Sequence, residues 1–143
     1  MAIHFYDTTG SLRLPAKRAL KAYLKLLFAD EETELRSLTY IFCSDEYLLK
    51  INNEFLLHDY YTDIVTFSLE NRGDPVVGEV YISIDRVKDN ATLWSTRFII
   101  ELHRVIFHGA LHLCGYKDKS ITQQKRMRAE EEKHLAHYFQ EVL

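Results

Sequence analysis

The stretch that decides the fold covers residues 93–118 and reads Leu-Trp-Ser-Thr-Arg-Phe-Ile-Ile-Glu-Leu-His-Arg-Val-Ile-Phe-His-Gly-Ala-Leu-His-Leu-Cys-Gly-Tyr-Lys-Asp. Its apolar residues recur every three or four positions, so we predict a long helix from about Leu93 to Cys114. At 100° per residue, the side chains that fall within one stripe predict the face that packs in the core. That stripe contains Phe98, Leu102, Val105, Ile106, Gly109 and Leu113.

A polar stripe adjoins the apolar one on the same helix. It contains Arg97, Glu101, Arg104, His108 and His112. We interpret its first three members as a charge pattern on the protein surface, because such residues commonly pair three or four positions apart on an exposed helix. The two histidines then lie at the margin of the buried face, where the floor of a cleft is expected.

His108 and His112 are four residues apart, which places two imidazoles on one face of a helix, one turn from each other. Gly115 can turn the chain out of the helix at little steric cost. Asp118 then brings a carboxylate that can fold back toward the same point. Two histidines and a carboxylate, with a fourth position left to water, are the ligands of a catalytic zinc site rather than a structural one. The pattern predicts a hydrolytic metalloenzyme.

Other candidate ligands lie in less favourable places. Cys114 is about 200° from His112 around the helix, so we interpret it as a small buried residue. His103 faces away from the pair by about 140°. His134 and His137 share a face of the last predicted helix, but nothing else there resembles a site.

Bulk composition predicts one globular domain over residues 1–143, with 47% hydrophobic and 27% charged residues. No apolar run approaches the roughly 18 residues of a membrane span, and the N-terminus lacks the pattern of a secretory signal. Two cysteines provide no disulfide framework, so we expect a cytoplasmic protein. For the oligomeric state, we favour a monomer. The net charge of −3 argues against coating nucleic acid by bulk charge but allows a local basic patch.

The rest of the chain alternates between strand and helix patterns. We predict strands over 2–6, 36–43, 62–69 and 77–84, and helices over about 15–29, 45–55, 85–91, 93–114 and 121–139. Ser44 is a predicted N-cap, and Ser120 with Gln123 matches a capping box. Turn residues over 71–75 indicate that the last two strands pair antiparallel. The prediction is an α/β fold with a small, mixed, mostly parallel four-stranded sheet packed with helices.

The motif His108-Gly-Ala-Leu-His112-Leu-Cys-Gly115-Tyr116 resembles that of the YbeY family, the bacterial endoribonucleases of rRNA maturation. Further matches follow the family's order over about residues 40–135. They are Asn52, Phe55, Asp59, Thr62-Asp63-Ile64-Val65-Thr66-Phe67, Gly78-Glu79-Val80 with Ile82, and a late helix with Met127 and Glu131. The resemblance implies three metal ligands, usually for one zinc ion, of which two map onto His108 and His112.

Three positions depart from the family pattern. The third ligand is a histidine in the family and Asp118 here, which zinc accepts but which also suits other divalent metals. The family's arginine, implicated in RNA cleavage, is replaced by Leu56, which cannot bind a phosphate. The proline expected before Thr62 is Tyr61. Asp63 is interpreted either as an anchor for a loop or ligand, or as the start of a strand.

The resemblance implies a metal-dependent endoribonuclease specific for single strands, acting in 16S rRNA 3′-end maturation and ribosome quality control. The implied partners are rRNA and ribosomal components. Basic residues flank the motif and are equally compatible with RNA contact and with a solvated helix face: Lys117, Lys119, Lys125, Arg126 and Arg128. Tyr116 can stack on a base, although a tyrosine after a turn glycine more often packs its own loop.

Three alternatives stay open. A metallopeptidase or amidase is disfavoured because Gly109 replaces the glutamate that serves as general base in His-Glu-x-x-His enzymes. A non-catalytic, metal-binding ribosome-assembly factor is compatible with Leu56. Finally, Asp118 could fail as a ligand, in which case the chain binds no metal.

Overall fold

The computed structural model describes residues 2–58 and 61–142. Its strands are β1 (Ala2–Asp7), β2 (Leu35–Cys43), β3 (Ile64–Ser68) and β4 (Val76–Ser83). Its helices are α1 (Lys17–Asp30), α2 (Asp45–Leu56), α3 (Ile84–Leu93), α4 (Phe98–Leu113) and α5 (Ile121–Val142). The sheet order is β1-β2-β4-β3; β1 with β2 and β2 with β4 are parallel, and β3 with β4 is antiparallel. The predicted α/β fold and the antiparallel pair are confirmed.

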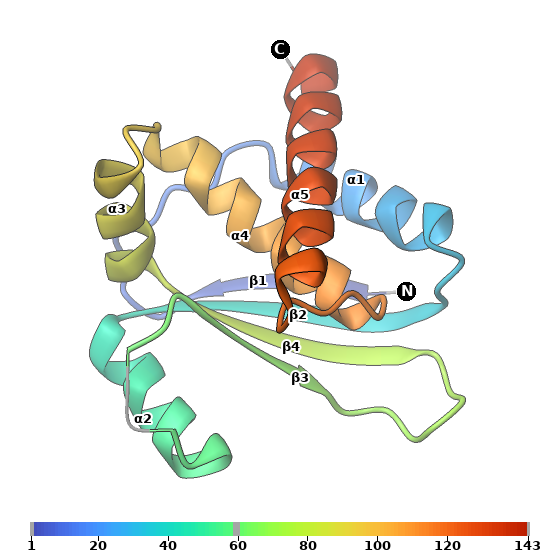
Figure 1. Ribbon diagram of the computed structural model, residues 1–143, viewed down its shortest axis with the longest axis horizontal. Helices are drawn as coiled ribbons and strands as arrows, with labels where there is room; N and C mark the ends of the chain where they lie inside the picture. Colours follow the sequence, from blue (N-terminus) through green and yellow to red (C-terminus); the bar gives the residue numbers. More distant parts are fainter. Residues whose placement is uncertain (1, 59–60, 143) are drawn as a thin grey trace.

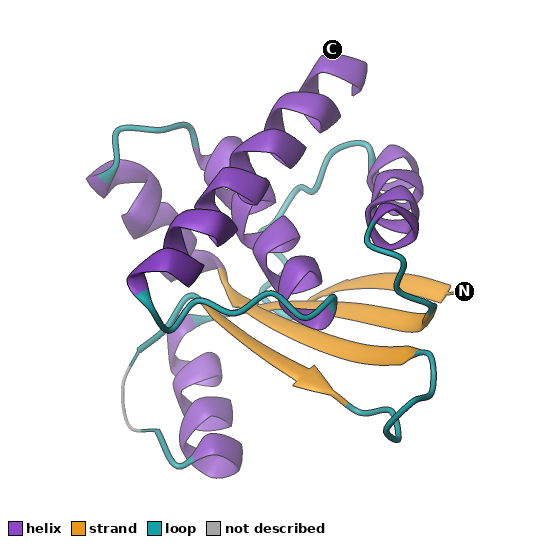
Figure 2. Cartoon of the chain, turned by 45° about the vertical axis from the view of Figure 1, so that its right-hand side comes forward, coloured by secondary structure: helices purple, strands orange, loops and turns teal. Residues whose placement is uncertain are grey.

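Helices cover both faces of the sheet. Helices α1, α3, α4 and α5 lie on one face, and α2 lies on the other (Figures 1 and 2). The main hydrophobic core fills the first side, and a small cluster of Cys43, Leu48 and Val65 lies on the α2 side. Within residues 2–58 and 61–142, every helix is too short or too polar to traverse a lipid bilayer.

The helix predicted over 93–114 is wrong at its start, because Leu93 ends α3 and α4 begins only at Phe98. Two hydrogen bonds close α3 in a Schellman motif, from the Ser95 N–H to the Thr92 carbonyl at 3.2 Å and from the Thr96 N–H to the Ala91 carbonyl at 2.9 Å. Ser95 takes the left-handed conformation at φ 53°, where glycine is usual. A serine in that position left no sequence signal for the break.

The other predicted helix ends agree closely with the structure. The Ser44 side chain caps α2 by accepting from the Tyr47 N–H. The capping box at the start of α5 is confirmed: the Gln123 N–H donates to Ser120 Oγ at 3.1 Å, and the Ser120 N–H donates to Gln123 Oε1 at 3.0 Å. This box fixes where α5 begins, and therefore which of its side chains face α4.

Helix α4 lies directly on the sheet because Gly109 has no side chain. A Cβ at this position would lie 2.8 Å from Val80 Cγ1 and 3.0 Å from Ile64 Cδ1. One turn earlier, the Tyr40 hydroxyl of β2 donates to the Ile106 carbonyl at 2.7 Å inside the core. The close approach and this bond together set the height of α4, and hence of His108, above the sheet.

We predict that Gly109→Ala lowers the free energy of unfolding by about 1–3 kcal/mol, because overpacking outweighs the roughly 1 kcal/mol gained in helix propensity. Denaturant unfolding measures the change. In a Val80→Ala background the same substitution should cost less, because the closest of the obstructing atoms, Val80 Cγ1, is gone and only Ile64 Cδ1 remains in the way. An equal cost in both backgrounds would contradict the close contact.

Candidate metal centre

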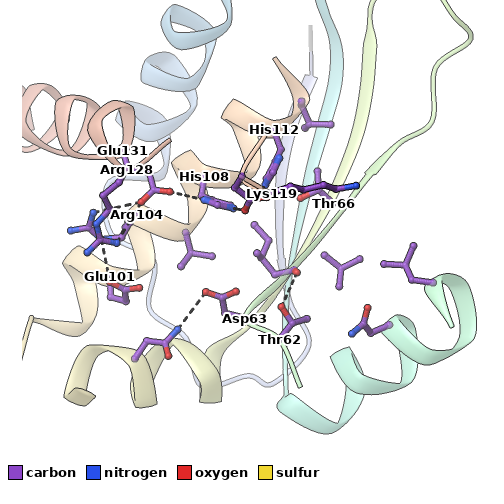
Figure 3. Close-up of a pocket in the computed structure, with 18 of the residues that line it drawn as sticks. Thr62, Asp63, Thr66, Glu101, Arg104, His108, His112, Lys119, Arg128 and Glu131 are labelled. Carbon is purple, nitrogen blue, oxygen red and sulfur yellow. Dashed lines mark hydrogen bonds and ion pairs between the residues drawn. The ribbon is translucent and has the colours of Figure 1, made fainter. Parts of the chain in front are cut away.

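A pocket of about 850 Å³ opens between the sheet edge at β3 and helices α2, α4 and α5. The three ligands predicted from the sequence all line it: His108, His112 and Asp118. Both imidazoles project from α4 toward the pocket, with Asp63 and Thr62 at its opposite wall (Figure 3). The side chains of the three predicted ligands are partly exposed, so a solvent-borne substrate can reach them.

The three predicted ligands converge on a single point. The Nε2 atoms of His108 and His112 each lie 3.3 Å from Oδ2 of Asp118. The two rings stand nearly perpendicular, at 78°, with centroids 4.5 Å apart. Neighbouring ligand atoms in a tetrahedral zinc site lie roughly 3.3–3.6 Å apart, given bonds of about 2.0–2.2 Å. The donor set and its spacing therefore fit a zinc-sized cation.

The opposite ring nitrogens are both held by acceptors. His108 Nδ1 donates to Glu131 Oε2 at 2.6 Å, and His112 Nδ1 donates to the Tyr116 carbonyl at 2.9 Å. With the proton on Nδ1, each neutral ring presents the lone pair of Nε2 to Asp118. Carboxylate and carbonyl acceptors on the far nitrogen are the usual support of metal-binding histidines.

Asp118 reaches the histidines through a tight turn after α4. Gly115 has φ 103°, a left-handed conformation that is strained for other residues. The Tyr116 N–H donates to the Leu111 carbonyl at 3.0 Å, which closes a second Schellman motif. The Tyr116 hydroxyl donates to the Glu31 carboxylate at 3.0–3.1 Å, and Arg126 lies 4.9 Å from the ring centroid. Tyr116 thus ties its loop to the end of α1 and to α5.

Behind His108, a network of charged side chains links α4 to α5. Oε1 of Glu131 lies 3.6 Å from Nη1 of Arg104 and 3.7 Å from Nη1 of Arg128, leaving Oε2 for His108. Arg104 also donates from Nε to Glu101 at 3.3 Å. Burial raises the pKa of Glu101, while the charges of Arg104 and Arg128 oppose that rise. The network holds Glu131 in position against the imidazole.

The surface charge pattern predicted for α4 is therefore wrong for two of its three members. Arg97 is exposed, but Glu101 and Arg104 are only 5% and 8% exposed. Helices α3 and α5 lie alongside α4 and cover this stripe (Figure 1). Arg104 and Glu101 instead line the pocket, which periodicity alone could not indicate.

The other histidine and cysteine candidates on α4 lie outside this centre. His103 is buried with Nδ1 donating to the Ile99 carbonyl at 2.8 Å, and its ring stacks on Tyr138. Burial raises the pKa of the half-buried Cys114 thiol to about 12. Asp59, which belongs to the family resemblance, lies outside the described residues.

Electrostatics in the pocket favour a cation. Burial lowers the pKa of His108, but the hydrogen bond and charge of Glu131, with the charges of Asp118 and Asp63, raise it above its usual value overall. A proton therefore competes with any cation that binds there. Burial raises the pKa of Asp63, and Glu131 and Asp118 add to the rise while His108 opposes it. Asp63 accepts a long side-chain hydrogen bond from Asn90 Nδ2, at 3.4 Å.

Comparison with known proteins identifies the family. The family model described as "Endoribonuclease YbeY" matches residues 5–139. The chain belongs to the YbeY family. A relative from Cytophaga hutchinsonii named Endoribonuclease YbeY is 45% identical over 134 residues, 94% of each chain. One from Porphyromonas gingivalis with the same name is 46% identical over 133 residues, covering 93% of this chain and 87% of that one.

A solved structure agrees in fold. The solution structure of a protein from Thermotoga maritima superposes with a TM-score of 0.64 at 24% identity, covering 98% of this chain and 91% of that one. The same fold is thus adopted by a second sequence that differs from this one at most positions. The family motif is also what singled out Glu131 in the sequence, although its bond to His108 joins residues 23 positions apart.

We predict that Asp63→Asn stabilises the metal-free protein at neutral pH by roughly 2–5 °C in Tm, because a raised carboxyl pKa makes the buried charge costly. Protonation of Asp63 in the folded state contributes to the free energy of unfolding. This contribution is fully present below the usual aspartate pKa of 3.8 and is lost as pH rises through the raised pKa of the folded state. The difference in Tm between Asp63→Asn and the wild type should therefore grow as pH rises from the usual pKa of aspartate through the raised pKa of Asp63.

Thermal unfolding in the presence of a chelator, from about pH 4 to about pH 8, measures this trend. Asp74→Asn is the matched control, since Asp74 is an exposed carboxylate in the turn between β3 and β4. A pH-independent difference between wild type and Asp63→Asn would show that the carboxyl group is not desolvated.

Proposed function

We propose that this chain is a metal-dependent endoribonuclease that cleaves single-stranded rRNA in the cytoplasm, in 16S 3′-end maturation and ribosome quality control. It would act as a monomer with one catalytic domain, on rRNA associated with ribosomal components. The observation that carries the proposal is the convergence of two imidazole Nε2 atoms on Asp118 in an open pocket, in a chain of a family named for endoribonuclease activity.

One zinc ion per chain would be held by His108, His112 and Asp118. A divalent ion so bound lowers the pKa of a coordinated water and polarises a phosphoryl oxygen, which is the chemistry that phosphodiester hydrolysis needs. Two nitrogen donors and one oxygen donor fit zinc, and they also accept other first-row divalent metals. The charge of Asp118, where the family has a histidine, makes this ligand set more negative.

The surrounding residues hold these ligands ready. Glu131 keeps the proton of His108 on Nδ1, and the Tyr116 carbonyl does the same for His112. Neither ring has to rotate or change tautomer before Nε2 can act as a ligand. The fixed rings are thus preorganised, so little ordering cost falls on the reaction itself.

Positive side chains in the pocket are suited to an RNA phosphate. Lys119, Arg104 and Arg128 all line it, and the Arg128 side chain is 55% exposed. Leu56 lines the same pocket at the position of the family's arginine. We propose that Arg128 and Lys119 supply the phosphate contact that Leu56 cannot make, since both are exposed whereas Arg104 is only 8% exposed.

Elemental analysis of untagged protein tests the ligand set, with wild type beside Asp118→Ala. We expect Asp118→Ala to hold about one zinc per chain fewer than the wild type, because a three-ligand site loses one ligand. Equal zinc content in the two proteins would mean that Asp118 is not the third ligand. Wild type that binds no metal would contradict the metalloenzyme.

Cleavage of a single-stranded RNA tests the activity. We expect wild-type protein to cleave it and the double variant His108→Ala, His112→Ala to lose cleavage to background, because both imidazole ligands are absent. Equal activity of the two proteins would contradict the proposal. Metal binding without cleavage would support an assembly factor, and cleavage of peptides but not RNA would support a peptidase.

We predict that Glu131→Gln weakens zinc affinity about 10–100-fold, because the acceptor that orients His108 loses its charge. Glu132→Gln is the matched control: it is adjacent on α5 and pairs with the same Arg104, whereas the hydrogen bond to His108 Nδ1 comes from Glu131. Competition titration with a chromophoric chelator measures both. Equal affinities for the two variants would show that Glu131 does not support the ligand.

A further inference from the structure

A second cluster of ligand-type side chains lies on a different face of α5. Glu131 faces the pocket, whereas Glu130 and His134, one turn apart, face α1. Glu31, at the C-terminal cap of α1, completes the cluster. Helices α1 and α5 lie on the same side of the sheet (Figure 1). One ligand atom from each of Glu31, Glu130 and His134 lies within 4.8 Å of the others.

The histidine of this cluster has an unsatisfied nitrogen. His134 is only 2% exposed, and its Nε2 has no hydrogen-bond partner among the described residues. Oε2 of Glu130 lies 3.9 Å from this atom, which is too long for a hydrogen bond. A buried polar atom left unpaired costs about 1–3 kcal/mol. The buried Nε2 of His134 is therefore available to bind a further partner.

The other nitrogen of His134 is held in the manner of a metal ligand. Its Nδ1 lies 2.6 Å from the hydroxyl of Tyr23, a residue of α1. If Nδ1 carries the proton, it donates to the tyrosine oxygen and Nε2 presents a lone pair toward Glu130. If Nε2 carries it, a buried N–H is left without an acceptor. The first tautomer, with a cation on Nε2, is the arrangement that satisfies both nitrogens.

We propose that Glu31, Glu130 and His134 form a second divalent-cation site, separate from the His108/His112/Asp118 centre. The donors are one imidazole nitrogen and two carboxylate oxygens, which suit zinc and other first-row divalent metals. Two of the donors are four residues apart on α5, and the third comes from α1, so a bound cation ties the two helices together.

This site is connected to the candidate metal centre through Tyr116. The Tyr116 hydroxyl donates to both Glu31 oxygens, and its backbone carbonyl accepts from Nδ1 of His112. A cation that fixes Glu31 therefore fixes the loop that orients His112 and carries Asp118. Its role is structural support of that loop, since none of the residues that line the first pocket belongs to the cluster.

Metal stoichiometry tests the proposal, using untagged protein dialysed against Zn²⁺ and then freed of loosely bound metal. We expect two zinc per chain in the wild type, and one in Glu31→Gln and in Glu130→Gln. Both substitutions are nearly isosteric at partly exposed positions, so the fold should survive, which circular dichroism checks. Glu34→Gln, an exposed carboxylate three residues from Glu31, is the matched control and should keep two.

The double variant His108→Ala, His112→Ala separates this inference from the proposed function. We expect it to keep one zinc, which Glu130→Gln added to it should remove. If the wild type binds one zinc and the double variant binds none, the second site is overturned and the first site stands. If the wild type binds one zinc, which the double variant keeps and Glu130→Gln loses, the second site is upheld and the first site is overturned.

Tyr23→Phe tests the role of the hydroxyl that holds His134. Removing a supporting partner of a ligand should weaken zinc binding at the second site about 10–100-fold. Titration of zinc into the His108→Ala, His112→Ala background isolates the second site for this measurement. Unchanged affinity in that background would overturn the assignment of Nε2 as the ligand atom.

Discussion

The hydrogen bond between His108 Nδ1 and Glu131 Oε2 joins α4 to α5 at the wall of the pocket. Because the carboxylate accepts from Nδ1, the Nε2 atom of His108 is the one that faces Asp118, at 3.3 Å. Arg104 and Arg128 stand behind Glu131 and balance its charge inside a partly buried network. Loss of this contact would leave the His108 ring free to turn and the Glu131 carboxylate without its imidazole partner.

Two glycines position the side chains of the pocket. Gly109 lets α4 lie against Val80 and Ile64, which sets the height of His108 above the sheet. Gly115 reverses the chain after α4 in a conformation that few other residues adopt, so that Asp118 returns to the histidines. The backbone turn at Gly115 therefore helps to bring the Asp118 carboxylate to the imidazoles.

Neighbouring residues of α5 take part in two separate clusters of side chains. Glu131 supports a predicted ligand of the pocket, and Glu130 with His134 reaches toward α1 on another face. The loop at Tyr116 belongs to both regions, since its carbonyl orients His112 and its hydroxyl contacts Glu31. The structure of this loop therefore depends on the packing of α1 and α5 as well as on α4.

The sequence by itself determined the succession of strands and helices along the chain, the spacing of His108 and His112, and the turn at Gly115. Each of these depends on residues that are close together in the sequence. It placed the start of α4 at Leu93, since Ser95 carries no glycine-like signal of a break. It also placed Glu101 and Arg104 on the surface, because periodicity describes one helix and not what covers it. Only tertiary structure brought Glu131 to His108 and Glu31 to His134, since contacts between distant segments depend on how whole helices pack.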